Sequence, residues 1–305
     1  MNNYIHKIKN LMSTAEIRAL HKLCDERGKM LIVAIDQRNS MRAILGSDKE
    51  TRAQISNDTL GLIKSDIVKY LGNQASAVLL DPVCALPEVI DEWIIARDVA
   101  LVVGIDKSGW EKDKTTPLRR SRIIDGMSPS AIRKLGGSAA KLLVYMRPDW
   151  KDGDKYALTL ISDTIEEYAK EELLLVIEIL PYRLPGENEK EYEVRKPELI
   201  IEAAKSAAEV GAKVLKLPFP GSAEACAKVS EVTNNALWSL LSAGVDHNEF
   251  KRQLKISLKG GATGAIVGRA LWKDCISLDH DITRARLEKV AVPRLNELKN
   301  ILKTI

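Results

Sequence analysis

Eight short apolar runs recur along this chain of 305 residues at nearly even intervals. Strands of a parallel sheet that are buried on both faces read as continuous apolar segments rather than alternating ones. The first run begins at residue 31 and the eighth at residue 264. The mean interval is therefore about 33 residues, which is the length of one strand–helix unit. The runs are Leu31–Ile35, Ala77–Leu80, Ala100–Val103, Lys141–Met146, Leu174–Ile179, Lys213–Leu217, Trp238–Leu241 and Gly264–Val267.

Helix signals fill the segments between these runs. Asp246 is a predicted N-cap with Glu249 three residues later, and Ser128 is followed by Pro129, which suits the first position of a helix. An alanine-rich segment over residues 200–209 ends before Gly211. The repeated order of strand, helix and glycine turn predicts an α/β chain folded as a (β/α)8 barrel, or TIM barrel.

The chain length permits a second interpretation, because 305 residues is about twice the length of a typical domain. The competing fold is a doubly wound open sheet, which needs a glycine-rich turn after its first strand. Asp36, Gln37 and Arg38 stand at that place instead. We therefore expect one barrel domain over residues 1–305, with an N-terminal helical extension over about residues 1–28.

The contents of histidine, cysteine and charge limit the chemistry. No histidine lies in a paired motif, so we expect no metal ion and no cofactor. The cysteines are scattered, which is typical of thiols in a reducing, cytoplasmic compartment. Lys and Arg exceed Asp and Glu by only +4 without a basic tail, which argues against a nucleic-acid partner. No apolar run approaches the ~18 residues of a membrane span, so we expect no membrane association. The four histidines are His6, His21, His247 and His280.

Charged residues interrupt three successive strands of the predicted barrel. Lys216 lies within an apolar strand, where an ammonium group is costly to bury and a second nearby cation adds to the cost. A neutral amine at this place can attack a ketone and form a Schiff base. Lys141, two strands away, is the candidate second cation, and Glu178 on the strand between them is the candidate proton shuttle. The alternative is a buried Lys–Glu–Lys ion network without chemistry.

Small and basic residues follow the last two strands, in loops that often bind phosphate in barrels. Ser242 and Gly244 follow the seventh strand, and Gly268 and Arg269 follow the eighth. We expect them to bind an anionic group of a substrate, although the glycines could merely permit tight turns.

Two further polar segments each have two interpretations. After the first strand, Asp36 could relay a proton while Gln37 and Arg38 bind an oxygen-rich chain, or Asp36 and Arg38 could cap the next helix and pair with each other. The basic run Arg119, Arg120 and Arg122 follows the third strand. Such a run is usually solvated, and contact with an anionic substrate is the alternative.

Several motifs resemble a known family, in the family's order, from about residue 30 to about residue 295. The chain is similar to the class I aldolases that include tagatose 1,6-bisphosphate aldolase and sulfofructosephosphate aldolase. The matching segments are AIDQRNSMR (34–42), LLDP (79–82), KLLVYMRPD (141–149), VIEIL (176–180), VLKLPFP (214–220), LSAGVD (241–246) and GRALW (268–272).

The resemblance implies a metal-free retro-aldol reaction on a (β/α)8 barrel. Lys216 matches the family's Schiff-base lysine, and Lys141 and Glu178 match the assisting lysine and the acid–base carboxylate. Asp36, Gln37 and Arg38 match the active-site triplet after the first strand. The family cleaves a ketose 1-phosphate to dihydroxyacetone phosphate and a three-carbon aldehyde, and it suggests a homo-oligomer.

The resemblance also bears on the substrate, a sugar phosphate or a sulfosugar phosphate. Residues 123–149 and the run Arg183-Leu184-Pro185 are more similar to sulfofructosephosphate aldolase than to the tagatose enzyme. We therefore expect 6-deoxy-6-sulfofructose 1-phosphate, with tagatose or fructose 1,6-bisphosphate as the alternative. Readings of other classes are a non-catalytic barrel that binds sugar phosphates as a regulator, and a phosphosugar isomerase or decarboxylase.

Overall fold

Parallel strands close into a barrel in this computed structural model, which describes residues 10–305 except for the side chain of Asp152. The order around the barrel is β1-β10-β9-β8-β7-β6-β3-β2. All eight predicted strands are present, with ends that differ by at most two residues, and the predicted (β/α)8 barrel is confirmed. The strands are β1 (Met30–Ala34), β2 (Ala77–Leu80), β3 (Ala100–Gly104), β6 (Ala139–Tyr145), β7 (Leu174–Leu180), β8 (Val214–Leu217), β9 (Leu237–Leu241) and β10 (Gly264–Val267).

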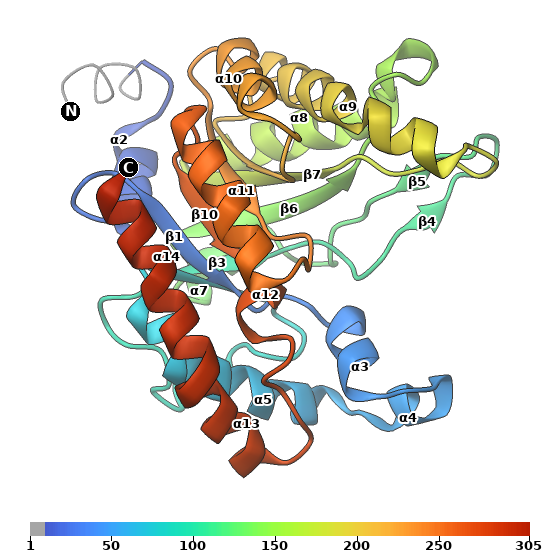
Figure 1. The fold of residues 1–305 in the computed structure, drawn as a ribbon. Coiled ribbons are helices and arrows are strands. Elements are labelled where there is room, and N and C mark those ends of the chain that lie inside the picture. The colour runs from blue at the N-terminus through green and yellow to red at the C-terminus, as the bar shows by residue number, and fades with distance from the viewer. Residues whose placement is uncertain (1–9) are drawn as a thin grey trace.

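Helices surround the barrel (Figure 1). The predicted caps are present, because the side chain of Asp246 accepts the N–H of Glu249 and that of Ser128 accepts the N–H of Ala131. No helix within residues 10–305 is both long enough and apolar enough to cross a membrane. The helices are α2 (Thr14–Leu23), α3 (Asn39–Leu45), α4 (Lys49–Gln54), α5 (Asn57–Tyr70), α6 (Glu88–Asp91), α7 (Pro129–Lys134), α8 (Lys155–Ala169), α9 (Glu189–Glu209), α10 (Ala223–Val232), α11 (His247–Lys259), α12 (Arg269–Trp272), α13 (His280–Arg286) and α14 (Val292–Thr304), with a π-helical turn at Leu287–Ala291.

The regular repeat fails in two connections. Between β2 and β3 the only helix is the one-turn α6, because Pro82 and Pro87 discourage an earlier helix and β3 already begins at Ala100. After β3 the chain forms an antiparallel hairpin of β4 (Glu111–Lys112) and β5 (Arg119–Arg120) before α7. This hairpin lies at the end of the barrel opposite α2 (Figure 1).

Helix α2 closes the N-terminal end of the barrel. Leu20 and Leu23 are buried in one cluster with the inward-facing residues of the strands, such as Met30 and Ile32. Glu16 of α2 accepts two hydrogen bonds from Lys213 beside β8, at 2.6 and 2.7 Å. Of the expected helical extension over residues 1–28, residues 1–9 lie outside the described part. Since one end of the barrel is closed, the opposite end is left for a site.

Candidate active site

Lys216 and Glu178 face each other across two neighbouring strands. Glu178 of β7 is the register partner of Lys216 on β8. Side chains of paired residues on parallel strands point to the same face of the sheet, and both point into the barrel here. The Lys216 Nζ lies 2.8 Å from Glu178 Oε2, and both side chains are buried. A nucleophile candidate and a proton acceptor are therefore already within hydrogen-bonding distance.

Lys141 occupies the centre of a group of carboxylates. Its Nζ lies 2.6 Å from Asp106 Oδ1, 2.7 Å from Asp36 Oδ2 and 3.2 Å from Glu178 Oε2. Because Glu178 Oε2 contacts both lysines, it links the two amines through one oxygen atom. The cluster joins β1, β3, β6, β7 and β8 at the C-terminal end of the barrel.

The carboxylates decide the charge of Lys141. Burial acts to lower the pKa of Lys141, but Asp106, Asp36 and Glu178 together outweigh burial and hold that pKa well above its ordinary value. Burial acts to raise the pKa of Asp36, but the ammonium groups of Lys141 and Lys216 bring it well below the usual range. Burial raises the pKa of Asp106, against the opposing effect of Lys141. Lys141 is therefore a fixed cation beside Lys216, compensated by its own acids.

Gln37 and Arg38, which follow Asp36 after β1, make different contacts. Gln37 Nε2 donates to Asp36 Oδ1 at 3.1 Å, while the buried Gln37 Oε1 has no hydrogen-bond partner among the described residues. Arg38 donates to the carbonyl of Asp106 and lies 4.0 Å from Asp81, while its buried Nε has no hydrogen-bond partner among the described residues. Gln37 thus offers a free acceptor and Arg38 an unpaired N–H donor.

A cavity of about 170 Å³ connects the lysine with the predicted phosphate loops. Gly268 lines it as a glycine for a physical reason, since a Cβ there would lie 2.6 Å from the carbonyl oxygen of Ala34. Gly244 does not line the cavity but packs behind it, where a Cβ would lie 3.3 Å from the Cζ atom of Arg269. Six predicted site residues line this cavity together: Gln37, Glu178, Lys216, Ser242, Gly268 and Arg269.

A larger cavity, of about 800 Å³, lies outside the barrel between α5, α6 and α13. Its walls include the apolar Leu62 and Trp93 and the pair His280–Asp66. It contains neither lysine of the barrel cluster. We place the candidate site in the smaller cavity, because the Lys216 amine, the Glu178 carboxylate and the predicted phosphate loops meet there.

Sequence reasoning did not select two charged residues near the site, Asp106 beside Lys141 and Lys64 beside Asp81. Asp106 follows the end of β3 just as Asp36 follows that of β1, and this shared position was the available signal. Lys64 forms a fully buried ion pair with Asp81, which also accepts the N–H groups of Val83 and Cys84. Nothing in the sequence separates Lys64 from an ordinary solvated lysine of α5.

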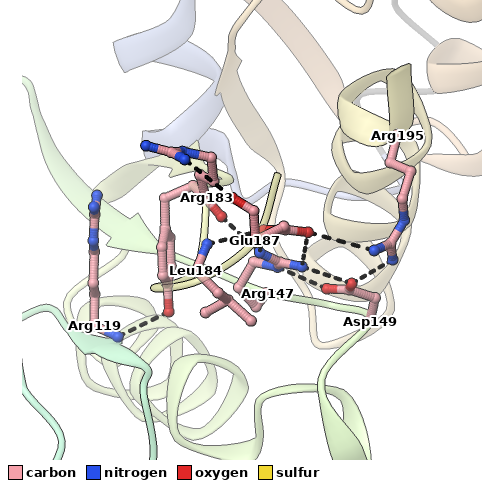
Figure 2. Close-up of polar contacts among 8 residues, drawn as sticks. Arg119, Arg147, Asp149, Arg183, Leu184, Glu187 and Arg195 are labelled. Atoms are coloured by element: carbon pink, nitrogen blue, oxygen red, sulfur yellow. Dashed lines mark hydrogen bonds and ion pairs between the residues drawn. The ribbon is translucent and has the colours of Figure 1, made fainter. Parts of the chain in front are cut away.

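An ion cluster stiffens the rim of the barrel after β6 and β7 (Figure 2). The buried Arg147 lies 2.8 Å from Asp149 and 2.6 Å from Glu187, and Arg195 of α9 lies 2.6 Å from the same Asp149. Glu187 also accepts the N–H of Leu184 at 2.9 Å. The loop after β7 is therefore bound to both flanking segments, which fixes the side of the site next to Glu178.

Comparison with known proteins gives the class of this chain. The model of one aldolase family matches residues 30–274, which contain all eight barrel strands and every candidate site residue. The chain is a carbon–carbon lyase, a class I aldolase. It belongs to the DeoC/LacD family aldolases. The readings as a non-catalytic regulator and as an isomerase or decarboxylase are therefore set aside.

Relatives of similar length agree with this assignment, and a solved structure shares the fold. The chain is 27% identical to tagatose 1,6-diphosphate aldolase 1 of Enterococcus faecalis over 96% of each chain. It is 29% identical to tagatose 1,6-diphosphate aldolase of Streptococcus pneumoniae over 83% of each. Its fold is similar to a fructose-bisphosphate aldolase from Slackia heliotrinireducens, with a TM-score of 0.64 and 18% identity over 96% of this chain and 93% of that one.

Proposed function

We propose that the protein cleaves a ketose 1-phosphate through a Schiff base on Lys216. The observation that carries the proposal is the contact of Glu178 Oε2 with Lys216 Nζ at 2.8 Å and with Lys141 Nζ at 3.2 Å. Glu178 can accept the proton that Lys216 must lose before its amine acts as a nucleophile. The proposed substrate contacts are Gln37, Arg38, Ser242, Gly244, Gly268 and Arg269.

The reaction requires Lys216 and a proton carrier at three points. The neutral amine adds to the C2 carbonyl, and the carbinolamine loses water to give an iminium ion. Loss of the C4 hydroxyl proton then breaks the C3–C4 bond, which releases an aldehyde and leaves an enamine. A proton adds to C3 of the enamine, and water hydrolyses the resulting imine to dihydroxyacetone phosphate and free Lys216. Glu178 is the proposed carrier, with Asp36 as a second relay held close to Lys141.

The first proposed substrate is 6-deoxy-6-sulfofructose 1-phosphate, which would give 3-sulfolactaldehyde. The similarity of residues 123–149 and of Arg183-Leu184-Pro185 to the sulfofructosephosphate enzyme supports it. The second candidate is tagatose 1,6-bisphosphate or fructose 1,6-bisphosphate, which would give glyceraldehyde 3-phosphate. Relatives at 26–29% identity are tagatose 1,6-diphosphate aldolases, which favours the tagatose bisphosphate.

Borohydride trapping tests the mechanism. Reduction of the protein in the presence of dihydroxyacetone phosphate should add one mass equivalent of the reduced ligand to Lys216, located by peptide mass spectrometry. Lys216→Met should abolish the adduct, whereas Lys213→Met, a lysine three positions away outside the cavity, should keep it. An adduct on another lysine, or none, would refute the assignment of Lys216.

A substrate panel separates the two candidates. Initial rates with the sulfosugar phosphate, tagatose 1,6-bisphosphate and fructose 1,6-bisphosphate are compared at equal concentration. A large excess in rate for either bisphosphate would reject the sulfosugar as the first choice. A single barrel domain, a homo-oligomeric state and a cytoplasmic location stay predictions, and the first two are open to cooperative unfolding and light-scattering measurements.

A further inference from the structure

Arg119 differs from the other two members of its basic run. Arg120 pairs with Asp113 and Asp154, at 2.8 and 2.9 Å, and Arg122 pairs with Glu111. Arg119 is half-buried, yet within residues 10–305 its guanidinium group has neither a carboxylate partner nor a hydrogen bond. Its charge is therefore not neutralised by a carboxylate of the described residues and is available to an anionic ligand.

Aromatic rings hold this cation in place. The Arg119 Cζ atom lies 4.5 Å from the ring centroid of Tyr182, 4.8 Å from that of Trp110 and 5.6 Å from that of Tyr145. Its backbone N–H donates to the hydroxyl of Tyr182 at 2.8 Å, which ties the β4–β5 hairpin to the loop after β7. The rings fix the side chain and leave the N–H groups of the guanidinium edge available for a ligand.

The rings also connect Arg119 with the lysine cluster. Tyr145 ends β6 and shares the inward face of that strand with Lys141, because side chains alternate along a strand. Burial raises the pKa of Tyr145, and the charges of Arg119, Glu178, Asp106 and Lys141 also act on it. Arg119 thus lies at the mouth of the barrel, beyond the site residues of β6 and β7.

The strand order places Arg119 and the phosphate loops on different sides of Lys216. Lys216 is on β8, the loops with Ser242 and Gly268 follow β9 and β10, and Arg119 stands over β7 and β6. A ketose phosphate whose C1 anion binds after β9 and β10 has its C2 atom at Lys216. The rest of a six-carbon chain can then extend toward the rim of β7 and β6.

A second arginine without a carboxylate partner stands on the same rim. Arg183 follows Tyr182 directly, is exposed, and donates only to the carbonyl of Glu187 at 3.0 Å among the described residues. Figure 2 shows the side chains of Arg119 and Arg183 on the side of the cluster away from Arg195. Because Arg147 and Glu187 fix this loop, Arg183 is presented at the rim by a rigid segment.

We infer that Arg119, assisted by Arg183, forms an anion subsite for a phosphate or sulfonate group at C6 of the substrate. The inference rests on the proposed function for the position of C2 at Lys216. Both groups are tetrahedral anions with three terminal oxygens that can accept from a guanidinium edge. Arg119 is therefore a specificity-determining residue that distinguishes ketose 1-phosphates with an anionic C6 from those with a hydroxyl there.

Kinetics of Arg119→Met test the subsite, because methionine keeps an apolar side chain among the rings and removes the charge. For the sulfosugar phosphate and for the bisphosphates, kcat/KM should fall about tenfold or more through KM, while for fructose 1-phosphate it should change less than about twofold. The substrate with the larger loss identifies the preferred anion. Lys112→Met on the same hairpin, exposed and equal in charge change, should alter no substrate. Equal losses for substrates with and without the C6 anion would overturn the inference.

Binding without turnover separates this inference from the proposed reaction. Calorimetry with hexitol 1,6-bisphosphate and hexitol 1-phosphate, which have no carbonyl group, needs no chemistry at Lys216. Arg119→Met should weaken the bisphosphate at least about tenfold and leave the monophosphate unchanged, and Arg119→Lys should recover part of the affinity. If this pattern appears without a borohydride adduct on Lys216, the subsite stands and the mechanism fails. If the adduct forms and both hexitols weaken equally, the subsite fails and the mechanism stands.

Discussion

A single ammonium group compensates several buried acids at the centre of the site. Lys141 contacts Asp36, Asp106 and Glu178, and replacement by methionine would leave these carboxylates without their nearest cation. Breaking a buried ion cluster by removing one partner costs about 3–5 kcal/mol. We expect Lys141→Met to lose about 3 kcal/mol of unfolding free energy at pH 8, measured by urea titration, together with most of the activity.

The loss of unfolding free energy in Lys141→Met should depend on pH. In the wild type the lowered pKa of Asp36 contributes stability that is present above the unfolded value of about 3.9 and is lost as the pH falls. In Lys141→Met the carboxylates no longer gain stability from the ammonium group. Their protonation at lower pH then reduces the repulsion between them. The difference between the two proteins should therefore be smaller at pH 5 than at pH 8. Lys205→Met, which removes a 57% exposed lysine paired with Glu209, is the control. An equal loss in both variants would contradict the role of Lys141.

For single residues, the sequence indicated which side chains belong to the cluster better than it indicated their contacts. Lys141, Glu178 and Lys216 stood out because charge inside an apolar strand is rare and costly. Their order along three strands suggested a cluster, and the strand register brings Glu178 between the two lysines. Arg38 donates to the carbonyl of Asp106, which its residue type did not indicate, and its contact with a substrate stays a prediction. The direction of a loop side chain depends on backbone angles that the residue type does not determine.

Among the elements, α2 closes the end of the barrel that lies away from the site. Leu23 is fully buried there, in one cluster with the inward-facing side chains of the strands. We expect Leu23→Ala to lower the unfolding free energy by about 2–5 kcal/mol, because truncation leaves a cavity in a packed floor. Its kcat should stay within about twofold of the wild type at a temperature where the variant is folded. Leu62→Ala, at a leucine of α5 that is 58% exposed, should cost less than about 0.5 kcal/mol. Similar losses in the two variants would show that α2 does not support the barrel.

Elements differed in how well the sequence predicted them. Strands of the barrel were predicted closely, because burial on both faces leaves a continuous apolar run that no other element here imitates. The β4–β5 hairpin was not predicted, since its short strands consist of Glu111–Lys112 and Arg119–Arg120. Tertiary contacts such as the bond from Arg119 N–H to Tyr182 accompany that hairpin, and local propensity gives no sign of them.

Across the whole molecule, the described histidines lie away from the lysine cluster. His21 belongs to α2 at the closed end of the barrel, His247 pairs with Glu297 of α14, and His280 pairs with Asp66 of α5. His6 lies outside the described residues. An aldol cleavage needs an electron sink for the carbanion at C3, and the cation that adjoins the cavity on β8 is the amine of Lys216, which becomes an iminium ion.

This arrangement predicts the response to chelation. We expect at least about 90% of the initial rate to remain after dialysis against EDTA, and added Zn²⁺ should not raise it, because the iminium ion of Lys216 takes the electron pair that a metal-bound enolate would otherwise hold. The assay monitors aldehyde release by the wild type, and a known zinc-dependent aldolase treated in parallel verifies that chelation is complete. Loss of activity in EDTA with recovery on Zn²⁺, combined with normal activity of Lys216→Met, would show that a metal ion and not Lys216 stabilises the carbanion. Loss of activity in Lys216→Met that neither EDTA nor Zn²⁺ alters would leave the lysine as the sole electron sink.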